Sequence, residues 1–176
     1  KDMQYSCAYF HNINIDLDQA QKDKKIHIIN KLQINEQMNV LDIGCGWGGM
    51  AIEIAKATGA KVKGITLSEN QYKTASERAQ KEGLNDKVSF VLQDYRNEKE
   101  KYDRIVSVGM FEHVGVKYFK TYLKKANDIL SIGKYYMINA FPNSFLKKKS
   151  NKLSIYWNDF ANHRTRFKST TWNDLK

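Results

Sequence analysis

Hydrophobic positions along the chain form short apolar runs, separated by longer stretches in which apolar residues recur with helical spacing. The apolar runs predict strands at residues 40–43, 61–67, 88–92 and 104–108. The stretches with helical spacing predict helices at residues 18–32, 50–58, 69–81 and 116–130. Strands that alternate with helices favour an α/β fold, in which a doubly wound, mostly parallel sheet is covered on both sides.

Several predicted helices carry end signals. Asp16 or Asp18 caps the first helix and Ser68 caps the third, because short polar side chains accept hydrogen bonds from the free N–H groups of a helix start. Gly59 and Gly83 each follow a helical stretch, where glycine is a common stop signal. The sequence therefore predicts where three of the helices begin or end.

Beyond residue 130 the pattern weakens. The stretch YYMINAF (135–141) favours a fifth strand, residues 145–152 form a basic loop, and residues 153–176 give mixed signals. Since no internal repeat or low-complexity linker interrupts the chain, we expect a single domain over residues 1–176.

Composition narrows the class of protein. The 176 residues are 41% hydrophobic and 27% charged, as in ordinary globular proteins. No apolar run approaches the roughly 20 residues that cross a bilayer. The chain does not begin with Met, so we expect it to be part of a longer protein. Cys7 and Cys45 form neither a CxxC pair nor a metal-ligand cluster, which favours a reducing, cytoplasmic setting.

The net charge of +10 is unevenly distributed. Residues 1–116 carry 16 basic and 16 acidic side chains, whereas residues 117–176 carry 13 Lys and Arg against three Asp. A basic surface of this kind attracts phosphate groups of nucleic acids or of anionic lipids. A lysine-rich face that contacts only solvent explains the same pattern equally well.

The segment DIGCGWGG follows a predicted strand and opens a helix. Its Gly44, Gly46 and Gly49 satisfy the spacing G-x-G-x-x-G, which raises a dinucleotide site as one interpretation and a plain strand–helix turn as another. Asp42 argues against NAD, because its carboxylate lies where a pyrophosphate would bind. The tip of the second strand, residues 66–68, also lacks the acidic residue that binds a ribose.

A carboxylate beside a glycine turn suits a cationic or zwitterionic ligand instead. S-adenosylmethionine carries both an ammonium and a sulfonium, so it fits this requirement.

Five segments occur together in a defined order: MQYSCAYF, VLDIGCGWGGMA, GITLSENQ, LQDYR and DRIVSVGMFEHVG. In this combination the chain resembles the cyclopropane fatty acid synthases, which are similar to the mycolic acid cyclopropane synthases, over residues 3–130. The resemblance implies an S-adenosylmethionine-dependent enzyme with a seven-stranded, Rossmann-like methyltransferase fold and an N-terminal helical segment. The basic tail, residues 131–176, is divergent, and we expect the C-terminal part of the family fold to be incomplete.

The resemblance also assigns residues to a cofactor site. Gly44 and Gly46 line the cofactor, and Tyr5 and Ser6 close over it. Asp42 is added to this site because its carboxylate lies at the tip of the first strand. The expected cofactor-binding residues are then Tyr5, Ser6, Asp42, Gly44, Gly46, Thr66, Leu67, Gln71, Tyr95, Arg96 and Val108. Thr66, Leu67 and Gln71 correspond to the ribose and methionine parts, and Tyr95, Arg96 and Val108 to the adenine. Core positions for Leu67 and Val108, and a surface position for Tyr95, are the structural alternatives.

The family reaction adds a methylene to a cis double bond in the acyl chain of a membrane phospholipid, with bicarbonate as the base. An alkene is a poor nucleophile, so the site must align it with the sulfonium and exclude water. Aromatic faces can stabilise the resulting carbocation. Tyr5, Tyr9, Phe10 and Phe111 are available for that role.

By resemblance, Cys7 and Glu112 are the catalytic residues that hold bicarbonate. Cys7 contacts the anion, and Glu112 accepts its hydrogen bond and orients it. The alternatives are that Cys7 is a small buried hydrophobe and that Glu112 complements a helix N-terminus. His113 is expected to be structural, and no metal is expected at the site.

The chain departs from the family at the fifth strand, where relatives carry a histidine that binds bicarbonate. Either Asn139 stands at the equivalent point, or Ser131–Gly133 is a remnant of that stretch. A later family tyrosine has no secure counterpart in WNDFANHRTRF.

The expected partners are phospholipid acyl chains at the membrane surface, which implies a cytoplasmic protein peripherally associated with the membrane. Nucleic acid is not expected, since the single proline, Pro142, excludes an Asn/Asp-Pro-Pro-aromatic motif for base-amine methylation. The alternatives are a small-molecule or RNA methyltransferase, with the basic tail as the RNA contact, and a cofactor-binding fragment with little turnover.

Overall fold

The computed structural model describes residues 3–12, 14–139, 155–156 and 169–170. The helices are α1 (Leu17–Leu32), α2 (Gly49–Thr58), α3 (Glu69–Lys81) and α4 (Phe119–Ile129). The main-sheet strands are β1 (Asn39–Ile43), β2 (Lys61–Thr66), β3 (Val88–Leu92), β4 (Tyr102–Val108) and β5 (Leu130–Asn139). Short 3-10 helices are η1 (Tyr95–Asn97), η2 (Phe111–His113) and η3 (Val116–Tyr118), and β6 (Ile155–Tyr156) pairs with β7 (Ser169–Thr170).

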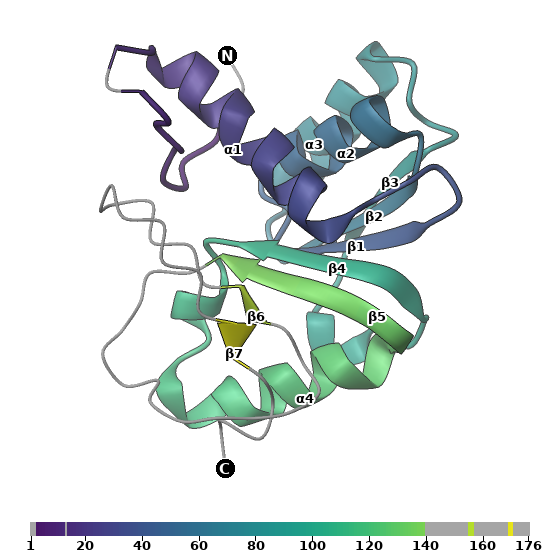
Figure 1. Cartoon of the computed structure of the whole chain (residues 1–176). Helices are drawn as coiled ribbons and strands as arrows, with labels where there is room; N and C mark the ends of the chain where they lie inside the picture. Colours follow the sequence, from purple (N-terminus) through teal and green to yellow (C-terminus); the bar gives the residue numbers. More distant parts are fainter. Residues whose placement is uncertain (1–2, 13, 140–154, 157–168, 171–176) are drawn as a thin grey trace.

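The five-stranded sheet has the order β3-β2-β1-β4-β5, and every neighbouring pair is parallel. Helices α1, α2 and α3 lie on one side of it and α4 on the other (Figure 1). The doubly wound α/β fold is thus confirmed. The strand order reverses between β1 and β4, and ligands of such sheets bind beyond the carboxyl ends of the strands at this point.

Two hydrophobic clusters occupy the two faces of the sheet, because alternate residues of each strand point to opposite sides. In β1, Val40 belongs to the cluster that includes residues of α1, α2 and α3, whereas Leu41 and Ile43 belong to the cluster that includes residues of α4. Asp42 follows the alternation of Val40, so its carboxylate lies on the face shared with α2.

The helix ends agree with the sequence signals and settle one alternative. Asp16, not Asp18, caps α1, and its Oδ1 accepts from the Gln19 N–H at 2.7 Å. Ser68 Oγ accepts from the Gln71 N–H at 3.4 Å at the start of α3. Gly59 ends α2 in the left-handed conformation, with φ at 74°. The predicted capping of these helices is therefore confirmed.

The boundary between the last helix and the fifth strand differs from expectation. The last predicted helix ends at Ile129, and Leu130 already begins β5, which runs to Asn139. The fifth strand is thus confirmed up to residue 139, and the rest of YYMINAF, the basic loop 145–152 and most of 153–176 lie outside the described residues.

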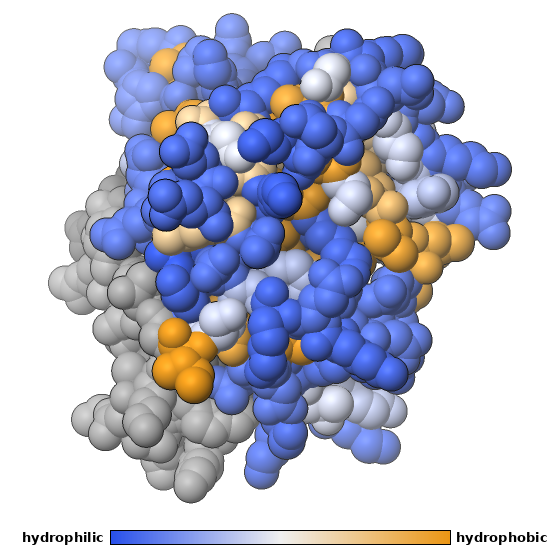
Figure 2. All heavy atoms as spheres, turned by 90° about the vertical axis from the view of Figure 1, so that its right-hand side faces the viewer, coloured by the Kyte–Doolittle hydropathy of each residue, from blue (hydrophilic) through white to orange (hydrophobic). Residues whose placement is uncertain are grey.

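The outer surface is mainly polar at the end of the molecule away from the arrowheads of β4 and β5. Figure 2 shows hydrophilic residues over most of this face, with hydrophobic residues in separate patches. In the part of the chain that the structure describes, no helix combines the length and hydropathy needed to cross a membrane.

Candidate active site

The glycine turn after β1 is anchored to the neighbouring strand. The backbone N–H groups of Gly44 and Cys45 both donate to the carbonyl of Ile65, at 3.0 and 3.1 Å. Gly44 has φ at 75°, and a Cβ there would lie 2.7 Å from Met110 Cγ. A side chain at this position would be strained and would displace Met110, so glycine is required where the turn meets the loop after β4.

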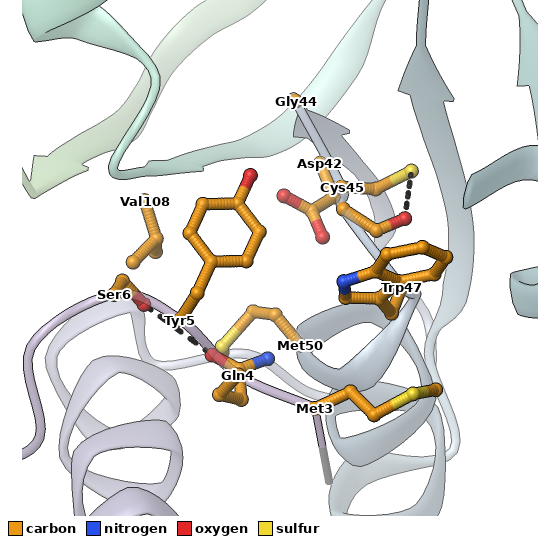
Figure 3. Close-up of a pocket in the computed structure, with 11 residues that line it drawn as sticks. Met3, Gln4, Tyr5, Ser6, Asp42, Gly44, Cys45, Trp47, Met50 and Val108 are labelled. Atoms are coloured by element: carbon orange, nitrogen blue, oxygen red, sulfur yellow. Dashed lines mark hydrogen bonds between the residues drawn. The ribbon is translucent and has the colours of Figure 1, made fainter. Parts of the chain in front are cut away.

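Residues 3–6, which we call the cover segment, lie across the glycine turn. Figure 3 shows Tyr5 standing between Val108 and the Asp42 side chain. A Cβ at Gly46 would lie 3.6 Å from Tyr5 Cε1, and one at Gly109 would lie 3.4 Å from Ser6 Cβ. The cover segment therefore touches the turns that follow both β1 and β4, and both Tyr5 and Ser6 line a pocket beside the glycine turn.

The larger cavity at the strand ends has a volume of about 380 Å³. Its walls come from the cover segment and from the ends of β1, β2, β3 and β4: Tyr5, Ile43, Gly44, Ile65, Thr66, Leu67, Ser68, Gln71, Gln93, Tyr95, Gly109, Met110 and His113. Six predicted cofactor residues meet here, namely Tyr5, Gly44, Thr66, Leu67, Gln71 and Tyr95.

A smaller pocket of about 30 Å³ adjoins it under the cover segment (Figure 3). It is lined by Met3, Gln4, Tyr5, Ser6, Asp42, Gly44, Cys45, Gly46, Trp47, Met50 and Val108. This pocket brings in Ser6, Asp42, Gly46 and Val108, and it shares Tyr5 and Gly44 with the larger cavity. Ten of the predicted cofactor residues thus form one continuous region.

Asp42 brings a buried carboxylate to the site. Its side chain is 1% exposed, and Oδ2 has no hydrogen-bond partner among the described residues. Burial raises the pKa of Asp42 to about 7. A buried carboxylate without a partner favours a ligand that brings a positive charge or hydrogen-bond donors.

Side-chain hydrogen bonds hold the edge of the larger cavity that follows β2. Thr66 Oγ1 donates to Gln71 Oε1 at 2.8 Å and accepts from the Ser68 N–H at 3.2 Å. Leu67 projects outward and is 72% exposed, so it is not a core residue. Tyr95 packs against Tyr122 with ring centroids 4.8 Å apart, which fixes an aromatic wall in the larger cavity.

Arg96 is the predicted cofactor residue that the structure does not bring to either cavity. Its guanidinium is exposed and forms a bidentate pair with Asp94, with Nη2 2.6 Å from Oδ2. Gln93, which the sequence analysis did not select, lines the cavity instead.

The two predicted catalytic residues have different surroundings. Glu112 lies in η2 and is partly buried, and its Oε2 has no hydrogen-bond partner among the described residues. A Cβ added at Gly109 would lie 3.8 Å from Glu112 Oε1 and 3.4 Å from Ser6 Cβ. Glu112 and Ser6 therefore both lie beside the turn that follows β4. Cys7 is exposed, which rules out its alternative as a buried hydrophobe, and it lines neither cavity.

Of the four aromatic residues considered for cation stabilisation, Tyr5 lines the cavities. Tyr9 instead stacks on His27 of α1, with ring centroids 4.8 Å apart. Phe111 is buried against Phe119 at 4.2 Å. Phe10 is exposed.

Several lining residues lie in the segments LQDYR and DRIVSVGMFEHVG but were not among the expected cofactor residues. Gln93, Gly109 and Met110 follow the ends of β3 and β4, so their position after a parallel strand was the available signal. His113 was expected to be a structural histidine, but it is exposed and lines the larger cavity.

The strand register separates the two placements considered for the missing histidine. Asn139 pairs with Val108 at the carboxyl end of β4, on the side of the site. Ser131–Gly133 lies at the amino end of β5, where Leu130 pairs with Tyr102. Of the two, Asn139 is therefore the position near the cavities.

Comparisons with known proteins show similarity in both sequence and fold. A model of the mycolic acid cyclopropane synthetase family matches residues 1–162. A probable fatty acid methyltransferase of Pseudomonas putida is 49% identical over 127 residues, which are 71% of this chain and 32% of that protein. The cyclopropane-fatty-acyl-phospholipid synthase of Escherichia coli K12 is 52% identical over 120 residues, 68% of this chain and 30% of that protein.

A solved structure of the mycolic acid cyclopropane synthase CmaA1, complexed with SAH and CTAB, superposes with a TM-score of 0.75 at 30% identity. The match covers 78% of this chain and 48% of that one. The chain spans about a third of the length of the curated relatives named above.

Proposed function

The chain belongs to the mycolic acid cyclopropane synthetase family, and on that premise we propose that it binds S-adenosylmethionine and takes part in adding a methylene to the cis double bond of unsaturated phospholipid acyl chains. The observation that carries the proposal is the buried carboxylate of Asp42, whose Oδ2 has no hydrogen-bond partner among the described residues. Asp42 lines the smaller of two adjoining pockets, which together contain ten residues that the resemblance or the strand-tip argument assigns to the cofactor.

The residues around the cavities fit S-adenosylmethionine. Asp42 supplies a negative charge for an ammonium, and the adjacent glycine turn has no side chains to block a close approach. Thr66 and Gln71 provide polar groups, and Tyr95 provides an aromatic wall. The cavity of about 380 Å³ lies within the range of roughly 300–1,000 Å³ usual for small-molecule sites. Once bound, the cofactor supplies an electrophilic methyl group.

Glu112 supports a role for bicarbonate as the base. A carboxylate oxygen that is buried without a partner accepts a hydrogen bond readily, and the O–H of bicarbonate can donate one. In this proposal Glu112 orients the anion, and Cys7 contacts it from the chain beside the cover segment. Tyr5 presents an aromatic face to the cavity and helps the cover segment to exclude water.

The surface before and along α4 supports contact with lipid. Val116 and Tyr118 are exposed apolar residues, with Lys117 between them. Lys120 and Lys124 are exposed on α4, although Lys124 also pairs with Asp128 at 2.6 Å. Apolar side chains among lysines suit a surface that meets anionic head groups while an acyl chain enters the site. This arrangement implies a peripheral position at the membrane.

Mass spectrometry of host phospholipids tests the proposal. Expression of the chain in a bacterium without its own cyclopropane synthase is expected to yield acyl chains heavier by one CH₂. Glu112→Gln should abolish this product while the purified variant still binds S-adenosylhomocysteine. Unmodified lipids together with methylation of RNA or of a small molecule would assign the chain to a different methyltransferase. Cofactor binding without any turnover would leave it a binding fragment.

A further inference from the structure

Lys24, in the middle of α1, is fully buried, which is uncommon for a lysine. Its Nζ donates to Ser6 Oγ at 2.7 Å and to Gln4 Oε1 at 2.9 Å. Both acceptors belong to the cover segment. A buried ammonium that bonds to the residues covering the candidate site therefore connects α1 to that site.

Further bonds from α1 hold the same stretch of chain. Gln21 Nε2 donates to the Ser6 carbonyl at 2.9 Å. The Tyr9 N–H donates to the Ala20 carbonyl at 3.1 Å. Ser6 is thus fixed at its backbone by Gln21 and at its hydroxyl by Lys24, so its side chain has a defined direction.

The chemistry of lysine also fixes which way the Ser6 hydroxyl bonds. An ammonium only donates hydrogen bonds, so Ser6 Oγ is the acceptor towards Lys24. The hydroxyl keeps its own hydrogen. Gln4 Oε1 lies 3.5 Å from Ser6 Oγ, at the limit of a hydrogen bond, and already accepts from Lys24. The Ser6 O–H donates to Gln4 Oε1 only over this long distance, so a closer acceptor on a ligand in the small pocket, which Ser6 lines, can take its place.

Ser6 and Asp42 line that pocket together, so it offers one hydroxyl donor and one carboxylate acceptor. This pair matches the two charged groups of an amino acid, a carboxylate at Ser6 and an ammonium at Asp42. We propose that Lys24 is a positioning residue that holds the Ser6 hydroxyl as the hydrogen-bond donor to the carboxylate of the cofactor's amino-acid end. The inference rests on the cofactor assignment of the proposed function and on no other part of it.

Two probes separate this role from general support of the fold. S-adenosylhomocysteine carries the amino-acid end, whereas 5′-methylthioadenosine keeps the adenosine and the sulfur without it. By calorimetry, Lys24→Met should weaken binding of S-adenosylhomocysteine about tenfold, or about 1.4 kcal/mol. The same variant should change binding of 5′-methylthioadenosine by less than about twofold. Lys22→Met is the matched control, since Lys22 is an exposed lysine of the same helix, and it should bind both probes as the wild type does.

A double-mutant cycle tests whether Lys24 acts through Ser6. If it does, Ser6→Ala should weaken binding of S-adenosylhomocysteine, and adding Lys24→Met should weaken it little further. Independent, multiplicative losses would contradict the proposal. Equal losses for both probes would also overturn it, because Lys24 would then support the cavity as a whole.

Lys24→Gln serves if Lys24→Met does not fold, because a glutamine stays polar but is too short to keep the bond to Ser6 Oγ. It should show the same selective loss for S-adenosylhomocysteine, and equal affinity for that probe in wild type and Lys24→Gln would refute the role of Lys24 alone. Failure of the wild-type chain to bind S-adenosylhomocysteine would instead remove the cofactor assignment, and this inference with it.

Discussion

The ionised carboxylate of Asp42 should destabilise the ligand-free protein and favour cofactor binding, and Asp42→Asn tests both effects. Burial raises the pKa of this carboxyl from 3.8 to about 7 in the folded state. The folded protein therefore binds the proton more tightly than the unfolded chain does. The contribution of Asp42 to stability is greatest below about pH 4 and decreases as the pH rises from about 4 to about 7, since ionisation of Asp42 is disfavoured only in the folded state.

The magnitude follows from that shift. A difference of about three pH units corresponds to about 4 kcal/mol of lost folding free energy above pH 7. Asparagine cannot ionise, so Asp42→Asn avoids this loss. Its amide still lacks a partner in the pocket, at a cost of about 1–3 kcal/mol. We therefore expect Asp42→Asn to stabilise the ligand-free protein by about 1–3 kcal/mol at pH 8.

Urea denaturation at a series of pH values measures this effect. The stability of Asp42→Asn relative to wild type should increase between pH 4 and pH 7 and then level off. In the same variant, calorimetry at pH 8 should show at least about tenfold weaker binding of S-adenosylhomocysteine, because the carboxylate that meets the ammonium is gone. A stability difference that does not vary with pH, or an Asn variant that is less stable at pH 8 and binds the cofactor normally, would refute the reasoning.

Three other predictions concern the same region. Gly46→Val should weaken cofactor binding at least about tenfold by calorimetry, since a Cβ at Gly46 already contacts Tyr5 and φ there is 55°; unchanged affinity would contradict the placement of the glycine turn. If the residues that bind bicarbonate lack one ligand, turnover should be slow and should rise with added bicarbonate. Asn139→His should raise the rate further, because Asn139 pairs with Val108 at the site. A rate that changes with neither would remove bicarbonate from the mechanism. Binding to anionic vesicles should fall steeply with salt, and Lys120→Glu should weaken it, each lysine near the surface contributing about 1 kcal/mol; equal binding to neutral vesicles would leave these lysines as a solvated face.

Local signals predicted the fold well, because they act over a few residues. The Asp16 cap, the Gly59 stop and the run of β1 each depend on neighbours in sequence, and each is found where expected. The boundary between α4 and β5 was less predictable, since a buried apolar residue such as Leu130 fits the end of a helix as well as the start of a strand.

The residues expected from the sequence lie together where a motif holds them at a strand end, as Gly44 and Thr66 do. The sequence is less informative where a side chain has a choice of partners. Arg96 follows Asp94 by two positions and pairs with it instead of turning towards the cavity. Lys24 lies in a polar stretch of the sequence, and its burial depends on contacts with residues distant in sequence, among them Gln4 and Ser6 of the cover segment.

The contact of Ser6 with the turn at Gly109 bears on the order in which the molecule assembles during synthesis. These two positions are about 100 residues apart in the chain, and contacts of such long range form late because closing the intervening loop costs entropy. A nascent chain leaving the ribosome can pair β1 with β2 and complete the glycine turn while the opposite wall has not yet been made. Residues 3–6 can bond to α1 as soon as that helix forms, but they complete their contacts only after β4 has emerged.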